Sequence, residues 1–169
     1  MMIRYNILLR PLEQSDAITI AELANNKKVA DNLRDLFPYP YHEHHAKAFI
    51  EFTQKENPQV TFGIEYKKEL CGVIGLVIQP DVYKKSAEIG YWIGEPFWGN
   101  GIATVAVGLI TEYGFTQLSL VKIHTGIFEY NIPSMKVLEK NGYMKECVFE
   151  KAIFKNGKIW DEHRYAKIR

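Results

Sequence analysis

The chain has 169 residues, of which 47% are apolar and 24% charged, a composition that fits a globular protein and excludes disordered and disulfide-framework classes. The 21 basic and 20 acidic residues give a net charge of +1, which disfavours nucleic-acid binding by bulk electrostatics. The longest apolar stretch, Ile102 to Ile110, is far shorter than the ~20 residues that cross a bilayer, and the first residues do not resemble a signal peptide.

The two cysteines, Cys71 and Cys147, form neither a disulfide framework nor a metal-ligand spacing. We therefore expect reduced thiols, a cytoplasmic location and no metal site. No internal repeat or linker interrupts the chain, so we expect a single domain over residues 1–169.

The first part of the chain predicts one short strand followed by helices. Ser15 and Asp16 are residue types that cap a helix start, and the residues after them are apolar at helical spacing. The expected elements are a strand over residues 7–9 and helices over 16–25, 29–33 and 43–55.

The middle and the end of the chain predict a sheet. Apolar residues alternate with other residues in several segments, and Asn156-Gly157 between two β-rich runs is typical of a hairpin turn. We expect strands over 60–66, 70–78, 87–93 and 121–128, helices over 102–113 and 132–140, and a final hairpin.

The resulting order is β-α-α-β-β-β-α-β-α-β-β. Because helices and strands do not alternate strictly, this order predicts an α/β (α+β) fold with a mixed sheet. Its first part is expected to be antiparallel, and a β-α-β crossover lies near the centre.

The segment from Ile89 to Thr104 carries the most chemical information. A strand enters the turn Gly99-Asn100-Gly101, and an amphipathic helix follows directly. The first N–H groups of a helix lack intrahelical partners and carry the positive end of its dipole. Glycines without Cβ atoms let an anion approach these groups, so the turn suits a phosphate or pyrophosphate. A Gly-x-Gly turn is also used simply to pack a helix closely against a strand.

Two common phosphate-binding motifs do not fit this segment. A dinucleotide fold requires a third glycine, where this chain has Thr104, and an acidic residue at the next strand, where residues 120–125 have none. A nucleoside-triphosphate P-loop requires Gly-Lys-Ser/Thr, which the sequence lacks.

Trp98-Gly99-Asn100-Gly101-Ile102-Ala103 resembles the acetyl-CoA-binding motif of the GNAT N-acetyltransferase superfamily, with Trp98 at a position where that motif has Gln or Arg. The stretch from Ala87 to Trp92 is similar to one found in the Rim-type branch, the ribosomal-protein N-terminal acetyltransferases. The blocks 131–134 and 138–143 and the opening residues 9–17 are also similar to the family, so the resemblance covers nearly the whole chain.

The resemblance implies a GNAT-like fold with a central β-α-β crossover that binds acetyl-CoA as co-substrate, without a metal. The backbone of Trp92 and Ile93 would pair with the pantetheine arm as an added strand does. The pyrophosphate would lie against the motif beginning at Trp98, on the N–H groups of Gly99, Asn100, Gly101, Ile102, Ala103 and Thr104. Asn131 would contact the cofactor near its thiol arm.

For catalysis the resemblance implies direct transfer of the acetyl group from the thioester to an amine. Many family members protonate the leaving thiolate with a Tyr at the position of Leu138, which has no proton to give. Ser134 is the alternative donor, as in the Rim branch, although Ser134 and Asn131 are also suitable helix-capping residues. Glu88 is the first candidate for the base, through one water, and His124 on the facing strand is the second. Each is also a residue type with ordinary structural uses.

Other polar residues have open roles. Glu129 and Tyr130 either line the site or belong to the surface of a loop. The acceptor would be bound by residues 32–45, with Tyr39, Tyr41 and His42 as an aromatic wall and with Asp31 and Asp35 attracting a cation. His42, His44 and His45 do not point to one side of a helix, which disfavours a metal site.

We expect the acceptor to be a primary amine, with a protein N-terminal α-amine as the first hypothesis. Small-molecule amines such as a polyamine, an amino acid or an aminoglycoside are the alternative, and a non-catalytic acyl-CoA-binding module is a third. No nucleic-acid or membrane partner is expected, and the protein is expected to be a monomer or a homodimer.

Overall fold

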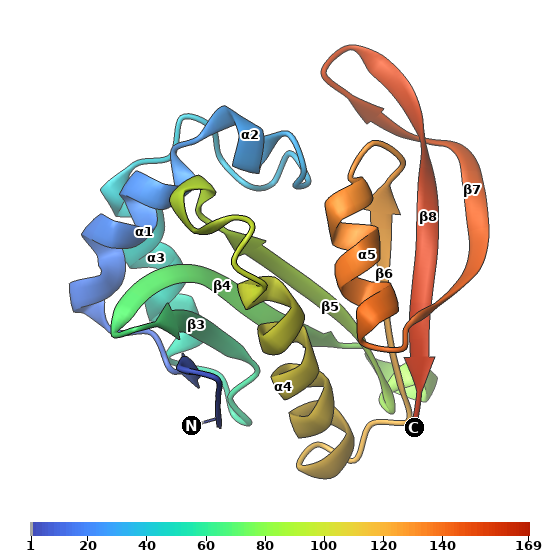
Figure 1. The fold of residues 1–169 in the computed structure, drawn as a ribbon, viewed down its shortest axis with the longest axis horizontal. Coiled ribbons are helices and arrows are strands. Elements are labelled where there is room, and N and C mark those ends of the chain that lie inside the picture. Colours follow the sequence, from blue (N-terminus) through green and yellow to red (C-terminus); the bar gives the residue numbers. More distant parts are fainter. Residues whose placement is uncertain (1) are drawn as a thin grey trace. The chain divides into compact units, whose positions relative to one another are not determined.

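Eight strands form one mixed sheet among residues 2–169, which the computed structural model describes (Figure 1). Their hydrogen-bonded order is β1-β2-β3-β4-β5-β6-β8-β7. The strands are β1 (Met2–Arg4), β2 (Ile7–Arg10), β3 (Thr61–Tyr66), β4 (Glu69–Ile78), β5 (Ser86–Ile93), β6 (Lys122–Phe128), β7 (Met144–Lys155) and β8 (Lys158–Ile168). The helices are α1 (Ala17–Ala24), α2 (Lys27–Ala30), α3 (Glu43–Thr53), α4 (Ile102–Thr116) and α5 (Ile132–Lys140), with 3-10 turns η1 (Gln14–Asp16), η2 (Asp81–Tyr83) and η3 (Glu95–Phe97).

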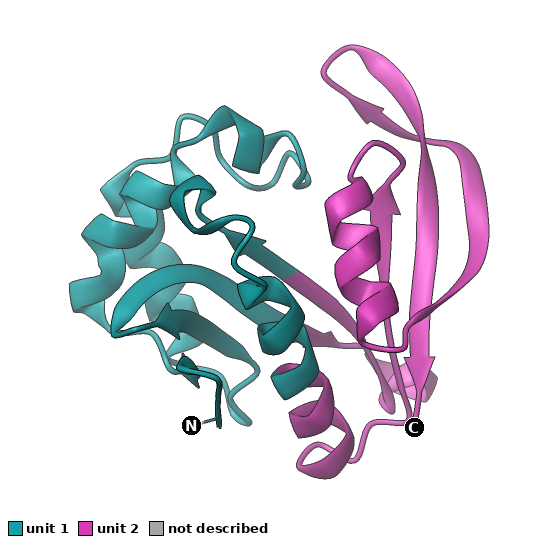
Figure 2. Ribbon diagram, in the orientation of Figure 1, with its two compact units in different colours: residues 1–75, 91–109 teal, residues 76–90, 110–169 magenta. Residues whose placement is uncertain are grey.

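The chain divides into two compact units, shown in two colours in Figure 2. Unit 1 comprises Met1–Gly75 and Tyr91–Leu109, and unit 2 comprises Leu76–Gly90 and Ile110–Arg169. The single domain expected over residues 1–169 stays a prediction, and the two units are described in turn.

In unit 1, the strands β1 to β4 pair antiparallel with their neighbours in sequence. Helices α1 and α3 pack together over a core that includes Leu12, Ile20 and Ile50, each of which is almost completely buried. At the entrance to η1, the carboxylate of Asp16 accepts two hydrogen bonds from the Arg10 guanidinium, at 2.8 Å each. The polar groups at this helix entrance are therefore paired rather than left buried without partners.

In unit 2, β5 pairs parallel with β6, and β8 lies antiparallel between β6 and β7. Helix α5 lies beside β6 and β8 (Figure 1), where Tyr165 donates a hydrogen bond to Glu139 at 2.9 Å. Burial and the Glu139 carboxylate raise the pKa of Tyr165 to about 12. A buried hydrogen bond of 2.8 Å joins the hydroxyls of Thr111 and Tyr143. These two hydrogen bonds tie α5 to β8, and the segment after α5 to α4.

Among residues 2–169, strand β7 lies at one end of the strand order, and its one neighbour in the sheet is β8. Nearly all of its twelve residues are exposed. Its register against β8 shifts twice, between Lys145 and Cys147 and between Phe149 and Ile153, and Lys151 has a φ of +52°. The ladder between β7 and β8 is therefore irregular at two places.

The α/β fold with a mixed sheet and a central crossover is confirmed, with three differences in detail. Strand β1 was not expected; it pairs with β2 through Tyr5 and Asn6, whose positive φ values of +50° and +61° make the tight connection. Three helices precede β3, close to the three ranges expected for them, whereas the expected element order counted only two. Asp16 does not cap α1: it accepts from the backbone N–H of Glu13 at 2.8 Å and thereby caps η1.

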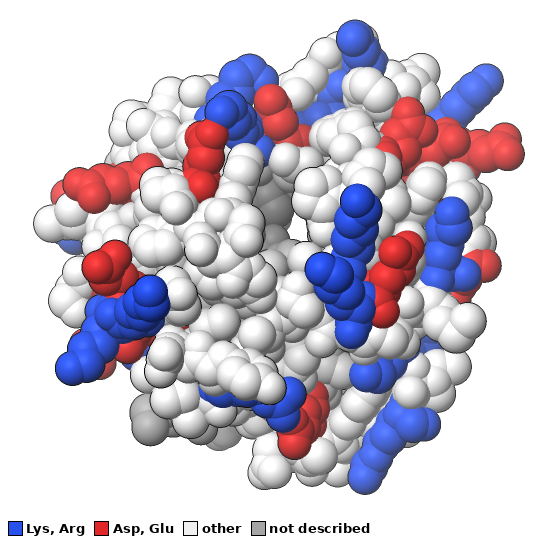
Figure 3. Space-filling model, in the orientation of Figure 1, with Lys and Arg blue, Asp and Glu red and all other residues white. Residues whose placement is uncertain are grey.

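On the face shown in Figure 3, basic and acidic side chains are interspersed, and no large area of one sign is visible among the residues drawn in colour. Within residues 2–169, no helix combines the length and the apolar composition required to cross a membrane.

Candidate active site

The glycine turn before α4 leaves its backbone open. Gly99 and Gly101 have φ values of +79° and +72°, a region that favours glycine. A Cβ built on either residue has no described atom within 4 Å, so space lies directly over the turn. The turn therefore has the accessible backbone that a bound pyrophosphate requires.

Helix α4 begins directly at this turn. The backbone N–H of Val105 donates to the Gly101 carbonyl at 3.3 Å. The N–H groups of Ile102, Ala103 and Thr104 precede this bond and belong to the first turn of a helix of 15 residues. Ile102 is 2% exposed and anchors the helix start in the core. These residues present the positive end of the helix dipole next to the open glycine backbone.

Two side chains of the motif hold the turn in shape. The indole N–H of Trp98 donates to the carbonyl of Ile93 at 2.7 Å. The side-chain amide of Asn100 donates to the carbonyl of Phe97 at 3.1 Å and to that of Trp98 at 3.2 Å. Trp98 thus fills the position of the family's Gln or Arg with a residue that ties the turn back to β5.

Helix α2 is tied to the 3-10 turn that precedes the glycines. The carboxylate of Glu95 accepts a hydrogen bond from the side chain of Asn26 at 2.7 Å and forms an ion pair with Lys28. Hydrogen bonds from Lys28 and Asn26 lower the pKa of Glu95. This connection could not be predicted from the sequence, because no periodic pattern links residues so far apart in the chain.

Trp92 and Ile93 lie on β5 within unit 1. The Trp92 ring packs edge-on against Phe37, with ring centroids 6.0 Å apart, and Phe37 lies 5.0 Å from Tyr41. A Cβ at Gly72 would lie 2.3 Å from the Trp92 carbonyl oxygen, so glycine is required there for β4 to approach. The requirement for Gly72 could not be inferred from an isolated glycine in an apolar run.

The segment expected to bind the acceptor is only partly open. Tyr41 is 6% exposed and belongs to the core, and its burial raises its pKa, so it does not form an open wall. Tyr39 is 52% exposed. The side chain of His45 accepts from the backbone N–H of His42 at 3.0 Å and caps α3. Among the described residues, no group of three or more potential metal ligands is placed to hold an ion.

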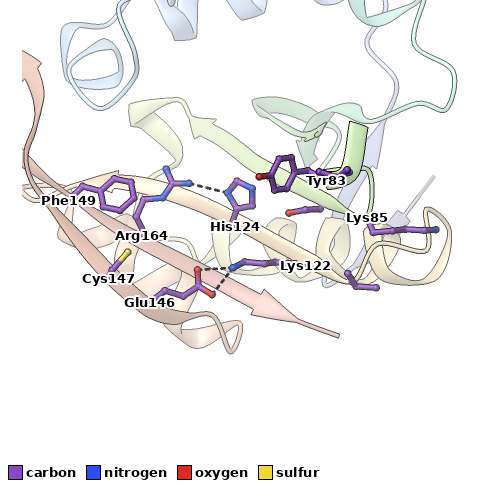
Figure 4. Close-up of a pocket in the computed structure, with 11 residues that line it drawn as sticks. Tyr83, Lys85, Lys122, His124, Glu146, Cys147, Phe149 and Arg164 are labelled. Atoms are coloured by element: carbon purple, nitrogen blue, oxygen red, sulfur yellow. Dashed lines mark hydrogen bonds and ion pairs between the residues drawn. The ribbon is translucent and has the colours of Figure 1, made fainter. Parts of the chain in front are cut away.

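Glu88 and His124 are register partners in the parallel pair β5–β6 of unit 2. His124 lies in an open pocket of about 510 Å³ whose lining includes Tyr83, Lys122 and Arg164 (Figure 4). The pKa of His124 is lowered by burial and by the charges of Arg164 and Lys122, against the opposing effect of Glu88. The two candidate bases are therefore electrostatically coupled neighbours.

Asn131 and Ser134 begin α5. The side-chain oxygen of Asn131 accepts from the backbone N–H of Ser134 at 3.3 Å and caps the helix. Leu138 is completely buried. Glu129 is fixed on β8, since its backbone N–H donates to the Asp161 carbonyl and its carboxylate accepts from the Asp161 N–H, each at 3.1 Å. Asn131 therefore has a structural role, and Glu129 is a structural residue rather than a mobile surface charge.

The expected site residues fall into two groups. Unit 1 brings together Trp92, Ile93 and the motif from Trp98 to Thr104. Unit 2 brings together Glu88 and His124, and it also holds Asn131 and Ser134 at the start of α5.

A family model described as an acetyltransferase (GNAT) domain matches residues 6–144. The chain belongs to the GNAT family. Among curated relatives, the probable N-acetyltransferase YjcK of Bacillus subtilis is 31% identical. The match covers 96% of this chain and 93% of the YjcK chain. The putative ribosomal N-acetyltransferase YdaF of Bacillus subtilis is 29% identical, and the match covers 97% of this chain and 92% of the YdaF chain.

Among solved structures, a spermidine N-acetyltransferase from Vibrio cholerae, in complex with CoA and spermine, has a TM-score of 0.83 at 25% identity. The match covers 98% of this chain and 96% of that one. The GNAT fold is thus confirmed, and the protein is an acyltransferase that uses acetyl-CoA as co-substrate.

Proposed function

We propose that the protein transfers the acetyl group of acetyl-CoA directly to a primary amine, with the pyrophosphate held by the turn from Gly99 to Ala103. The observation that carries the proposal is the open glycine backbone at the start of α4. A diphosphate placed there accepts hydrogen bonds from the first N–H groups of the helix and interacts favourably with the helix dipole. We assign the backbone of Trp92 and Ile93 to the pantetheine arm, which would pair with it as an added strand does.

The reaction requires three events at the acceptor and the thioester. The amine nitrogen attacks the thioester carbon, the carbon–sulfur bond breaks, and the thiolate takes a proton. We assign Glu88 as the acceptor of the amine's proton, through one water, and Ser134 as the donor to the thiolate. The buried, apolar Leu138 supports the assignment of Ser134, because Leu138 stands where many family members have the tyrosine that protonates the thiolate.

For the acceptor, a protein N-terminal α-amine is the first proposal and a small-molecule amine the second. YdaF supports the first through its name as a putative ribosomal N-acetyltransferase. The Vibrio cholerae structure supports the second, since it contains spermine. A cytoplasmic location and a monomeric or homodimeric state remain predictions from the sequence.

The test is acetyl-CoA-dependent thiol release with a panel of amines. The panel contains peptides with free and with blocked N-termini, spermidine, an amino acid and an aminoglycoside, and the blank contains no amine. The blocked peptide is the matched control, because it offers the same sequence without the nucleophile. We expect one amine class to exceed the others in kcat/KM by at least about a hundredfold, the discrimination that a pocket's polar contacts provide. Release no faster than the blank with every amine would contradict the proposed transfer.

A further inference from the structure

A chain of charged and polar side chains crosses the strands of unit 2 beside Glu88. Glu162 on β8 is 9% exposed and pairs with Arg164 at 3.2 Å. The Nη2 atom of Arg164 lies 3.2 Å from Nδ1 of His124 on β6, and Figure 4 shows the guanidinium pointing at this ring. His124 is in turn the register partner of Glu88 on β5.

Gly126 makes room for this chain. A Cβ at Gly126 would lie 2.1 Å from a carboxylate oxygen of Glu162 and 2.8 Å from Nη1 of Arg164. Both side chains therefore lie across the β6 backbone where glycine leaves space. The position of the Arg164 guanidinium follows from this packing and does not depend on a flexible surface side chain.

The contact with Arg164 fixes the protonation of the His124 ring. A guanidinium has only donors, so Nδ1 of His124 must present its lone pair. In a neutral imidazole the proton then lies on Nε2. An imidazolium would place a second N–H on Nδ1, directed at a permanent cation, which is unfavourable.

The groups around His124 act on its pKa in both directions, with a net lowering. Burial lowers the pKa of His124, as do Arg164 on β8 and Lys122 on the same strand, while Glu88 on β5 and Glu146 on β7 oppose them. Tyr83 and Lys85 line the same pocket from η2 and the segment after it. Lys122 is held by Glu146 at 2.7 Å, which leaves Arg164 as the described cation in contact with Nδ1.

We propose that Arg164 is a positioning residue which holds His124 as the neutral Nε2–H tautomer. In this state His124 orients Glu88 through a hydrogen bond donated from Nε2–H, and Glu88 remains the base. The proposal rests on the proposed acetyl transfer to an amine. It also decides between the two candidate bases. His124 has no lone pair to offer a substrate, since Nε2 carries a hydrogen and the lone pair of Nδ1 is engaged.

The tautomer can be measured without a substrate. In uniformly 15N-labelled protein, we expect the nitrogen shifts of His124 to show a protonated Nε2 and an unprotonated Nδ1 at neutral pH. Arg164→Met should mix the two tautomers and raise the midpoint of His124 titration towards the ordinary value of about 6.5. Lys122→Met is the matched control: it removes a neighbouring cation without removing the hydrogen bond, so the midpoint rises and the tautomer stays. A protonated Nδ1 in the unmodified protein would overturn the proposal, and this result requires no variant.

Rates then test the positioning role. Arg164→Met should lower kcat/KM for the amine roughly tenfold, as expected for a slightly misplaced base, without changing the KM for acetyl-CoA. The acidic limb of the kcat/KM–pH profile should move in Arg164→Met, whereas the profile of Lys122→Met should keep its form. An altered tautomer with unaltered rates would overturn the positioning role. Full activity of Glu88→Gln would overturn the proposed base, a failure that the nitrogen shifts distinguish from failure of the tautomer assignment.

Discussion

Asp16 shows how one carboxylate orders the entrance to a helix. It accepts two hydrogen bonds from Arg10 and one from the backbone N–H of Glu13, and it is 8% exposed. Burial alone would raise its pKa, but the bonds from Arg10 and Glu13 outweigh this effect and hold the pKa below its ordinary value of 3.8. A carboxylate with a lowered pKa stabilises the fold above its unfolded-state pKa, and this stability is lost as the pH falls through the folded-state pKa.

Asp16→Asn should lower the free energy of unfolding by about 3 kcal/mol at pH 7, because it leaves the buried side of Arg10 without its main partner. Urea unfolding at several pH values measures the effect. The difference from the unmodified protein should begin to shrink as the pH falls below 3.8, the ordinary pKa, and should vanish as the pH falls through the lowered pKa of folded Asp16. An equal difference at pH 7 and at low pH would show that the charge of Asp16 is not the cause.

Ser134→Ala should lower kcat roughly a hundredfold, the lower end of what general acid catalysis contributes, with little change in the KM for acetyl-CoA. The reason is that a proton given to the leaving thiolate matters in the transition state and not in binding. Ser134→Thr keeps the hydroxyl and should restore most of kcat. If the alanine variant changes only KM, Ser134 is a binding or capping residue.

At the scale of elements, one side chain closes the connection between α3 and β3. The carboxylate of Glu56 accepts from the backbone N–H groups of Val60 at 3.0 Å and Thr61 at 2.8 Å, and from the Thr61 hydroxyl at 2.6 Å. The side chain of Gln59 donates to it as well, at 2.9 Å. The backbone N–H groups of this connection thus find hydrogen-bond acceptors in a side chain, where those of a strand find them in the neighbouring strand.

Glu56→Ala should destabilise the protein by about 2 kcal/mol, since two backbone N–H groups lose a charged acceptor. Hydrogen exchange should show lost protection at Val60 and Thr61 before the rest of β3. Glu69→Ala, a change of the same size at an exposed strand end, is the control and should leave stability nearly unchanged. Equal effects of the two variants would contradict the role of Glu56.

Elements with a regular pattern could be predicted from the sequence, and contacts between distant elements could not. Alternation located β3 and β5, a nearly continuous apolar run located β4, and Asn156-Gly157 located the turn between β7 and β8. Strand β1 has only three residues, too few to show a period. The glycine turn was found because its residues are consecutive. Arg164 was missed because only the strand register brings it to His124.

At the scale of the whole molecule, acetyl-CoA should raise the thermal midpoint. A ligand at a hundredfold excess over its Kd stabilises the native state by about 2.7 kcal/mol. In a protein of this length that corresponds to a shift of roughly 5–10 °C. Gly101→Glu should abolish the shift, because it places a negative side chain where the pyrophosphate is proposed to bind. Calorimetry provides the binding constant directly.

Gly157→Glu is the matched control for this experiment. Gly157 has a φ of +74° and open space at its Cβ position, as Gly101 does, but it lies in the turn between β7 and β8. Both substitutions therefore impose the same backbone strain and add the same charge. A thermal shift that survives in Gly101→Glu, or that disappears in Gly157→Glu as well, would contradict the assignment of the turn.

The irregular register of β7 bears on how the protein behaves at high concentration. A long, regular outer strand offers donors and acceptors in a row to which a strand of another molecule can add. The two register shifts and the exposed Lys145 and Lys151 interrupt that row. We therefore expect the outer edge of β7 to resist fibre-like association, so that the exposed apolar side chains Phe149 and Phe154 are displayed without making the sheet a template for aggregation.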